Sequence, residues 1–423
     1  MSNKNLLSLF LGIGFDILLS IFLTFPAHAT GLFRLESETL NSFRRNEQNK
    51  LEVPIYELVS ASYMTDKKDL EINSNFSLSA DPTGNNTNRA NLYIMDARFV
   101  VVPERMSIRL GRTFDVIDTI GAASVDLVSA DFFALHQQLR FGTFWGIEHH
   151  LDSLDSNLKS NIAGARIDYH TDEAQSLFLA SKFVQRINTS NHNYEEDLVQ
   201  FSGKKTMAAA WSPELIFDSE SDLKSSNLNR LEVGTDLYPT INTFSKVRLM
   251  TYNVLPQTGV EQPIYTIFAT GPLYEARFNF EKKFSSFFTG GFTVFYDDYQ
   301  LLTNQRATGT GGELEEKFYF DLGSHLSNTT YSFQSYGGNA IGDRVMGTMP
   351  TSSKNEVYGL IDATYYEKIT SSKRGAFTFE TGWSKIIARQ YKLTLGAQAS
   401  SNNTLKDDFR SLAKLTYLLW DEI

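Results

Sequence analysis

Alternation of apolar and polar side chains is the feature that most constrains this chain of 423 residues. The alternation has a period of two over segments of about ten residues, and Gly, Asn, Asp and Ser gather between the segments. Leu70, Ile72, Phe76 and Leu78, for example, share one face of such a segment, and the residues between them are polar. Because consecutive strand residues point to opposite faces, this period predicts an all-β fold of antiparallel hairpins.

Aromatic-rich stripes are clearest in the C-terminal third, at residues 274–280, 288–296 and 377–383. The chain holds 32 Phe and 19 Tyr, whereas its 10 prolines leave few strand breakers. Charged or small polar residues occupy the face opposite the stripes at 274–280 and 377–383. An apolar, aromatic-rich face opposite a polar one is typical of transmembrane β-barrels, whose outer face meets lipid. A soluble β-sandwich also alternates, and the stripes alone leave that alternative open.

The first 29 residues are unlike the rest of the chain. Lys4 precedes an almost entirely apolar run at 6–25, and Ala27 and Ala29 are small residues at the positions that signal peptidase reads. This layout predicts a secretory signal peptide, residues 1–29, cleaved after Ala29. An uncleaved anchor is the alternative, because the run is long enough to cross a bilayer. Asp16 disfavours the anchor, since a carboxylate at the bilayer centre costs about 2.5–3.5 kcal/mol.

Beyond Ala29, no segment is as apolar and as long as a transmembrane helix. A mature chain that spans a membrane must then close into a barrel, because only helices and barrels satisfy every backbone polar group in lipid. The turn spacing predicts a transmembrane antiparallel β-barrel of about 16–18 strands. We expect residues 30–50 to be a periplasmic N-terminal segment and 51–423 to be the barrel, with an inward loop near 115–135. The other polar stretches, expected as turns or loops, are 81–89, 151–159, 189–195, 218–229, 303–312, 346–354 and 400–408.

Residues that could carry catalysis or bind a metal are sparse, and we expect no catalytic residue, no metal site and no cofactor. Cysteine is absent, which excludes disulfides and thiolate chemistry. His149 and His150 would point to opposite faces of a strand, so they make a poor chelate. Asp131, His136, Glu148 and His149 are candidates for a hydrolase, but their spacing does not require a site. The net charge of −10 disfavours nucleic acid as a partner, since nucleic acid binds a concentrated basic surface.

Charged side chains lie opposite the apolar stripes at nine positions. A Lys or Arg on the lipid side at mid-membrane would cost about 2–4 kcal/mol, so these side chains are expected to face the lumen. Opposing charges across a water-filled channel sort solutes by size and charge. A plugged barrel whose inward charges pair with one another is the alternative. The predicted pore-lining residues are Asp96, Arg98, Arg109, Lys246, Arg248, Glu275, Arg277, Glu380 and Lys392.

Four short motifs near the start of the predicted barrel resemble a known group of proteins. Residues 54–59 read Pro-Ile-Tyr-Glu-Leu-Val, residues 92–98 Leu-Tyr-Ile-Met-Asp-Ala-Arg, residues 107–112 Ser-Ile-Arg-Leu-Gly-Arg and residues 124–128 Ser-Val-Asp-Leu-Val. The run resembles uncharacterised porin-like outer-membrane barrels of Gram-negative bacteria, in which a strand ending Leu-Gly-Arg precedes an inward loop with an Asp. The sequence departs from that pattern at Leu127, where the family usually has Gly.

The sequence favours a passive porin-like channel of the bacterial outer membrane that passes small hydrophilic solutes. Arg98 and Arg109 are expected to help set its charge selectivity. Membrane lipids and solutes are the expected partners, and a homotrimer is considered because porins are commonly trimeric. The alternative is a closed structural or surface-binding barrel without channel activity. An outer-membrane hydrolase ranks last, so no enzymatic activity is expected.

Overall fold

The computed structural model describes residues 31–422. The described part leaves out the connections 46–49, 84–88, 114–123, 150–158, 172–175, 189–193, 208–210, 254–268, 302–304, 336–337, 368–374, 389 and 402–407. The predicted signal peptide, residues 1–29, lies outside the described residues. Within the described part, no helix has the length and apolar character needed to cross a membrane.

Strands make up most of the described chain, and a short 3-10 helix, η2 (Asp321–Gly323), follows β17. The strands are β1 (Gly31–Arg45), β2 (Leu51–Glu52), β3 (Ile55–Thr65), β4 (Leu70–Ala80), β5 (Arg89–Val102), β6 (Met106–Thr113), β7 (Ser124–Ala134), β8 (Leu139–His149), β9 (Lys159–His170), β10 (Leu177–Asn188), β11 (Tyr194–Thr206), β12 (Glu214–Asp222), β13 (Asn227–Thr240), β14 (Thr243–Asn253), β15 (Ala269–Lys283), β16 (Phe288–Leu301), β17 (Arg306–Tyr319), β18 (His325–Ser335), β19 (Gly338–Ser352), β20 (Asn355–Glu367), β21 (Gly375–Ala388), β22 (Tyr391–Ser401) and β23 (Asp408–Glu422).

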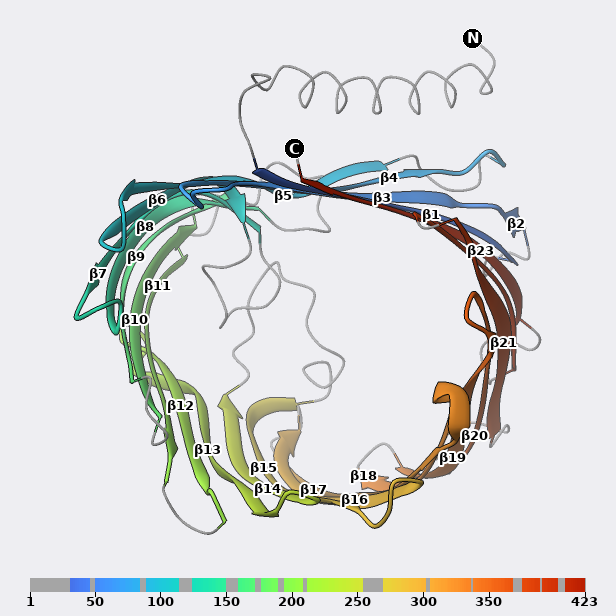
Figure 1. Ribbon diagram of the computed structural model, residues 1–423. Coiled ribbons are helices and arrows are strands. Elements are labelled where there is room, and N and C mark those ends of the chain that lie inside the picture. The colour runs from blue at the N-terminus through green and yellow to red at the C-terminus, as the bar shows by residue number, and fades with distance from the viewer. Residues whose placement is uncertain are drawn as a thin grey trace.

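The strands close into a barrel, which Figure 1 shows as a ring. From β3 onward each strand pairs antiparallel with the next, and β1 pairs with both β3 and β23. The strand β2 precedes β3 and pairs with the end of β1 in the same register as β3, with Arg45 opposite Leu51, so β2 and β3 form one wall strand. The described residues therefore form a closed antiparallel barrel of 22 strands. Closure pairs both edges of the sheet, which a membrane-spanning sheet requires.

The number of strands corrects the sequence prediction of 16–18. Three of the polar stretches expected to be loops are partly strand. Residues 218–229 contain the end of β12 and the start of β13, residues 303–312 contain the start of β17, and residues 346–354 contain the end of β19. These strand ends carry few large apolar side chains, so the period-two signal fades there. Strand segments beyond the lipid need no apolar face, and counting stripes therefore underestimates the strands.

The start of the described chain corrects a second expectation. Residues 31–45 are strand β1 of the barrel wall, so they do not form the periplasmic segment predicted at 30–50. Phe33 and Leu35 follow the pattern of an outward stripe, but Ser37 and Thr39 continue it with hydroxyls. Both hydroxyls hydrogen-bond to the Glu57 carboxylate on β3. These two hydroxyls interrupt the apolar stripe on the outer face, so the sequence does not show the alternation that would predict a strand.

The inward loop predicted near 115–135 is corrected in its second half. Residues 124–134 form strand β7, paired with β6 and β8, whereas residues 115–123 lie outside the described part. Val125 and Leu127 are apolar on the lumen face, and Val128 and Phe132 are apolar on the outer face. Because both faces of β7 carry apolar residues, its sequence does not alternate and resembles no amphipathic strand.

The two ends of the barrel have connections of different length. Turns such as 103–105, 241–242 and 353–354 lie at one end, which is also the end where β1 begins. Connections at the other end include 114–123 and 254–268. Outer-membrane barrels have short turns on the periplasmic side and longer loops outside the cell. By this rule, we expect the end with the short turns to face the periplasm.

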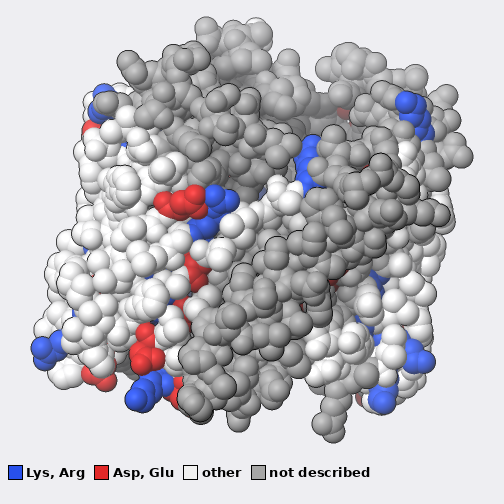
Figure 2. Space-filling model, turned by 90° about the horizontal axis from the view of Figure 1, so that it is seen from above, with Lys and Arg blue, Asp and Glu red and all other residues white. Residues whose placement is uncertain are grey.

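The outer face of the barrel is apolar. Large apolar side chains there are 40–59% exposed, among them Phe99, Trp145, Phe201, Val294 and Ile341. Uncharged residues cover most of the described surface in Figure 2, and most of the Lys and Arg residues lie toward its upper and lower margins. Soluble proteins rarely expose so extensive an apolar surface. This band disfavours the soluble β-sandwich that the sequence left open.

Aromatic rings gather at the short-turn end of β15 to β18. Phe288 stacks on Phe284 and on Phe318 with ring centroids 5.4 and 5.1 Å apart. Phe287 contacts Phe318 and Phe320 at 5.7 and 5.5 Å. Aromatic girdles of this kind mark the interface between lipid and water in outer-membrane barrels. Their position fixes one border of the lipid-facing band.

Candidate functional site

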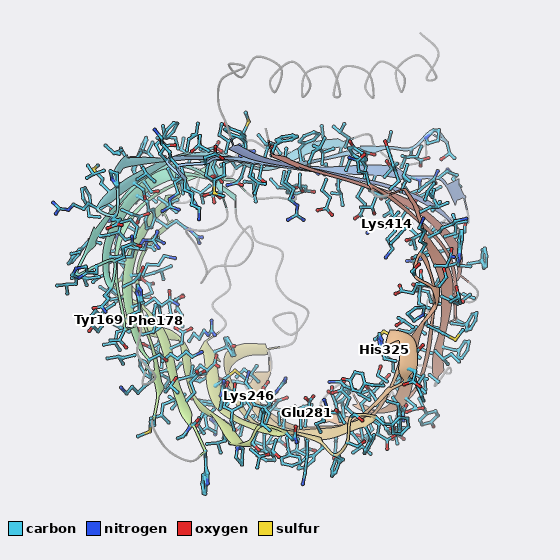
Figure 3. The ribbon with its side chains drawn as sticks, in the orientation of Figure 1. Tyr169, Phe178, Lys246, Glu281, His325 and Lys414 are labelled. Atoms are coloured by element: carbon cyan, nitrogen blue, oxygen red, sulfur yellow. The ribbon has the colours of Figure 1, made fainter. Side chains whose placement is uncertain are left out.

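The lumen face of the wall carries the charged residues that the sequence singled out. Cross-strand register places all nine predicted pore-lining residues on one face of the sheet. Figure 3 shows that this face points inward, since Lys246, Glu281 and Lys414 project into the ring while Tyr169 projects outward. The register thus places the nine residues where the parity argument expected them. Whether they line a path for solutes remains a prediction.

The lumen face at β4 to β6 holds two weak ion pairs. Arg98 lies 4.0 Å from Glu71, and Arg109 lies 3.8 Å from the buried Asp96. The side chain of Arg98 is 39% exposed, so its charge is available to the lumen. A polar recess of about 450 Å³ lies beside these pairs, lined mainly by Ser, Asn and charged side chains of β1, β3, β4 and β5. The geometry brings three predicted residues of this wall, Asp96, Arg98 and Arg109, together.

A stronger cluster on β7 to β9 was not predicted. Asp131 accepts hydrogen bonds from Arg140 at 2.8 Å and from Arg166 at 3.0 Å. Arg140 also lies 3.8 Å from Asp168. Arg166 and Asp168 stand two residues apart on β9, and this spacing is the signal that could have indicated a charged lumen face. The sequence does not specify the register between β7, β8 and β9 that brings Arg140 and Arg166 to Asp131.

Arg248 is the most enclosed of the predicted residues. Its side chain is 4% exposed and lies 3.1 Å from Glu232 and 2.5 Å from Asp236, both on the neighbouring β13. Arg230 adds a 2.8 Å contact to Glu232. Lys246, two residues from Arg248 on the same face, is half-buried. Arg248 therefore acts as a link within the wall, and its charge is largely matched before any solute arrives.

The remaining predicted residues lie on β15, β21 and β22. Arg277 pairs with Glu275 at 2.7 Å, and its side chain stays 45% exposed. Glu380 accepts a hydrogen bond from the Gln398 amide at 3.3 Å, and Lys392 is exposed at the short-turn end of β22. These residues are spread around the ring with the other predicted ones. The lumen wall is thus a distributed charged surface and has no single focus.

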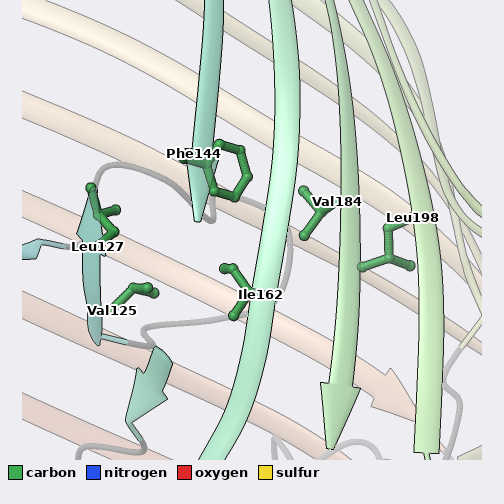
Figure 4. Close-up of a cluster of buried hydrophobic side chains, with 6 residues drawn as sticks. All are labelled: Val125, Leu127, Phe144, Ile162, Val184 and Leu198. Carbon is green, nitrogen blue, oxygen red and sulfur yellow. The ribbon is translucent and has the colours of Figure 1, made fainter. Parts of the chain in front are cut away.

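An apolar patch interrupts this charged surface. Six buried side chains lie close together on β7 to β11 and share the lumen face by register, as the close-up in Figure 4 shows. They are Val125, Leu127, Phe144, Ile162, Val184 and Leu198, and none is more than 7% exposed. Apolar side chains on a wall that meets only water would be exposed. Their burial therefore marks a part of the lumen wall that is shielded from solvent.

The hydrolase candidates lie at separate places on β7 and β8 and in the turn between them. Asp131 is paired with two arginines, and His136 lies in the turn before β8. Glu148 stands near the far end of β8, about 30 Å from Leu139, the first residue of the strand, at 3.3 Å per residue. Glu148 and His149, at the end of β8, therefore lie far along the sheet from Asp131 and His136. Among the described residues, no group of three His, Cys, Asp or Glu could hold a metal ion.

Comparison with solved structures relates the chain to outer-membrane barrels. The siderophore receptor PirA from Pseudomonas aeruginosa matches with a TM-score of 0.61 and 10% identity, over 93% of this chain and 81% of that one. A variant of the ferric enterobactin receptor PfeA from the same organism matches with a TM-score of 0.62 and 8% identity, over 92% and 82%. The copper transporter OprC matches with a TM-score of 0.56 and 11% identity, over 93% and 81%.

These similarities concern the fold. Identities of 8–11% are too low to transfer a ligand or a residue's role. No protein-family model matches the sequence, and no curated protein matches it either. The shared feature is the large antiparallel barrel itself.

Proposed function

We propose that the protein is an outer-membrane pore that passes small hydrophilic solutes by diffusion. The observation that carries the proposal is the contrast between the two faces of one closed sheet. The outer face is an apolar band with an aromatic border, and the lumen face carries charged residues on many strands, interrupted by the apolar patch on β7 to β11. An apolar exterior suits lipid, and a polar interior suits water and polar solutes.

The width of the barrel supports the same function. Barrel diameter grows with strand number, and barrels of 16–18 strands already leave an aqueous channel. A ring of 22 strands is wider than side chains alone can fill. Exposed charges such as Arg98, Arg277 and Arg344 would then meet permeating ions and bias their passage.

Recording from planar lipid bilayers tests this proposal. The purified mature protein, refolded in detergent, is expected to insert and give stepwise conductance in potassium chloride. Its folded state is checked beforehand by β-sheet circular dichroism and by heat-modifiable mobility on gels. Protein that passes both checks and inserts into liposomes, yet never conducts, would overturn the pore.

A closed barrel that binds partners through its ends is the second candidate. The shielded apolar patch on β7 to β11 favours it, because a wholly water-filled lumen would leave those side chains exposed. Transporters with 22 strands also commonly hold a plugged lumen. Inserted protein without conductance would favour this candidate over the pore.

A further inference from the structure

Three aromatic side chains lie together on the lumen face at β16 and β18, and we call Phe295, Tyr331 and Phe333 the aromatic tract. Phe333 stacks on Tyr331 with ring centroids 5.3 Å apart and planes at 20°, and it lies 5.6 Å from Phe295. All three side chains are partly exposed. Their register places them in phase with the lumen-facing Arg277 and Glu313, and out of phase with the lipid-facing stripe of β16.

Two glycines explain why the rings lie against the wall. A Cβ at Gly311 on β17 would overlap both Phe295 and Phe333, and one at Gly342 on β19 would overlap the Tyr331 ring. The rings therefore rest over bare backbone and remain partly exposed on the lumen side. An aromatic face carries the negative side of the ring quadrupole, which attracts C–H groups and cations.

Paired charges border the aromatic tract on both sides. The Arg277 guanidinium lies 5.4 Å from the centre of the Phe295 ring and is paired with Glu275. On the other side, Tyr331 donates a hydrogen bond of 3.0 Å to Asp362, which also accepts one of 2.7 Å from Arg344. Each guanidinium has a carboxylate partner, and Glu313 opposite Tyr331 adds a further carboxylate, so the borders supply many hydrogen-bonding groups and a net negative charge.

We propose that the aromatic tract is a binding site for the rings of neutral saccharides passing through the lumen. A sugar ring has C–H groups on its faces, which fit aromatic rings, and hydroxyls at its edge, which fit paired carboxylates and guanidiniums. The additional carboxylate of Glu313 disfavours an anion. Neighbouring strands lie about 4.8 Å apart, so the tract and its borders from β15 to β20 can accommodate a short oligosaccharide.

This inference rests on the proposed pore, because saccharides must reach the lumen, but binding is measured without conduction. Isothermal titration of maltotriose into the detergent-solubilised full chain is expected to give saturable binding. The double variant Phe295→Leu/Phe333→Leu keeps apolar volume but loses both flat faces, and it is expected to weaken binding about ten-fold, as loss of a stacked ring does elsewhere. Phe292→Leu, on the lipid-facing side of β16, is the matched control and should leave the affinity unchanged.

A second variant separates the rings from the hydroxyl. Tyr331→Phe keeps the ring and removes the hydrogen bond to Asp362, so it should weaken binding less than the double variant. Folded protein that does not bind maltotriose, or a double variant that binds as tightly as the natural chain, would overturn the aromatic tract as a saccharide site. Tight binding of benzoate or benzylamine with no binding of maltotriose would also overturn it. A conducting protein with any of these results would leave the pore intact.

Discussion

Arg248 shows at the residue scale how an inward charge can serve the wall. Its guanidinium lies between the Glu232 and Asp236 carboxylates and is almost wholly buried. Removing one partner of a buried ion pair leaves an uncompensated charge, which is much worse than never having the pair. In this position the arginine stabilises the contact between β13 and β14.

Arg248→Met is therefore expected to lower the free energy of unfolding by about 3–5 kcal/mol. Urea titration in phospholipid vesicles, followed by tryptophan fluorescence, measures the change. Lys246→Met, on the same face of β14 and half-buried, is the control and should cost less than about 1 kcal/mol. Equal losses for the two variants would contradict a structural role for Arg248.

Arg98 represents the other kind of inward charge, since its side chain is 39% exposed and its partner Glu71 is 4.0 Å away. Its field reaches the lumen water with little compensation. Arg98→Glu is expected to shift the reversal potential under a potassium chloride gradient toward cation selectivity. Arg98→Lys should leave the reversal potential unchanged. A conducting pore whose reversal potential stays the same when the charge at position 98 is reversed would show that Arg98 does not face the ion path.

Gly111 shows a residue whose backbone decides its identity. It has a φ of +121°, and a Cβ there would overlap the Met95 carbonyl oxygen on β5. Gly111→Ala is expected to destabilise the barrel by about 1–3 kcal/mol, measured by the same urea titration. Gly359→Ala, where a Cβ would meet ordinary contacts, is the comparison and should be nearly neutral. A similar loss at both positions would contradict strain at Gly111.

The residue identities on the lumen face were predictable, but their partners were not. Parity and the cost of charge in lipid are local properties, so Arg277 and Glu380 could be placed inward from their own strands. The contacts of Asp131 with Arg140 and Arg166 depend on register between strands, which a single sequence does not specify. The aromatic tract had a local signal, because Phe295 interrupts the phase of its stripe, but its contact with Phe333 did not.

At the scale of the element, adjacent residues of β16 point to opposite faces, one toward lipid and the next toward the lumen. Val294 is 47% exposed on the outer face, and Thr293 on the lumen face accepts a hydrogen bond from Asn279 at 2.8 Å. Val294→Lys is expected to cost about 2–4 kcal/mol if it lies near mid-membrane. Thr293→Lys should cost only the lost hydrogen bond, about 1 kcal/mol. Unfolding titrations in vesicles compare them, and a cheaper Val294→Lys would reverse the assignment of the faces.

Strands with a clean alternation were predictable, whereas mixed ones were not. The stripes at 274–280 and 288–296 fall within β15 and β16. Strands β1 and β7 were missed as strands for opposite reasons, because β1 has hydroxyls on its outer face and β7 has apolar residues on both faces. The hydroxyls of β1 hydrogen-bond to the Glu57 carboxylate, and the lumen-facing apolar residues of β7 belong to the shielded apolar patch.

At the scale of the whole molecule, the unequal connections predict the orientation in the membrane. Ile241 is fully exposed in a short turn, and Leu223 is 57% exposed in a turn at the opposite end. Since the chain has no cysteine, single substitutions can be labelled without background. A membrane-impermeant maleimide should label Leu223→Cys on intact cells, and Ile241→Cys only after the outer membrane is permeabilised. The reverse pattern would invert the orientation.

The pairing of β1 with β23 also has a consequence for how the barrel assembles. Every other contact in the ring joins strands that are neighbours in sequence, so each can form as a local hairpin with a short loop to close. The seam between Leu32 and Glu422 is different, since it joins residues almost 400 positions apart. Until the last strand pairs with the first, the sheet has two unpaired edges, and the entropy cost of closing the chain into a ring is still to be overcome. We therefore expect the pairing of β23 with β1 to be the slow step of barrel assembly, and the step that depends most on the assembly machinery of the cell.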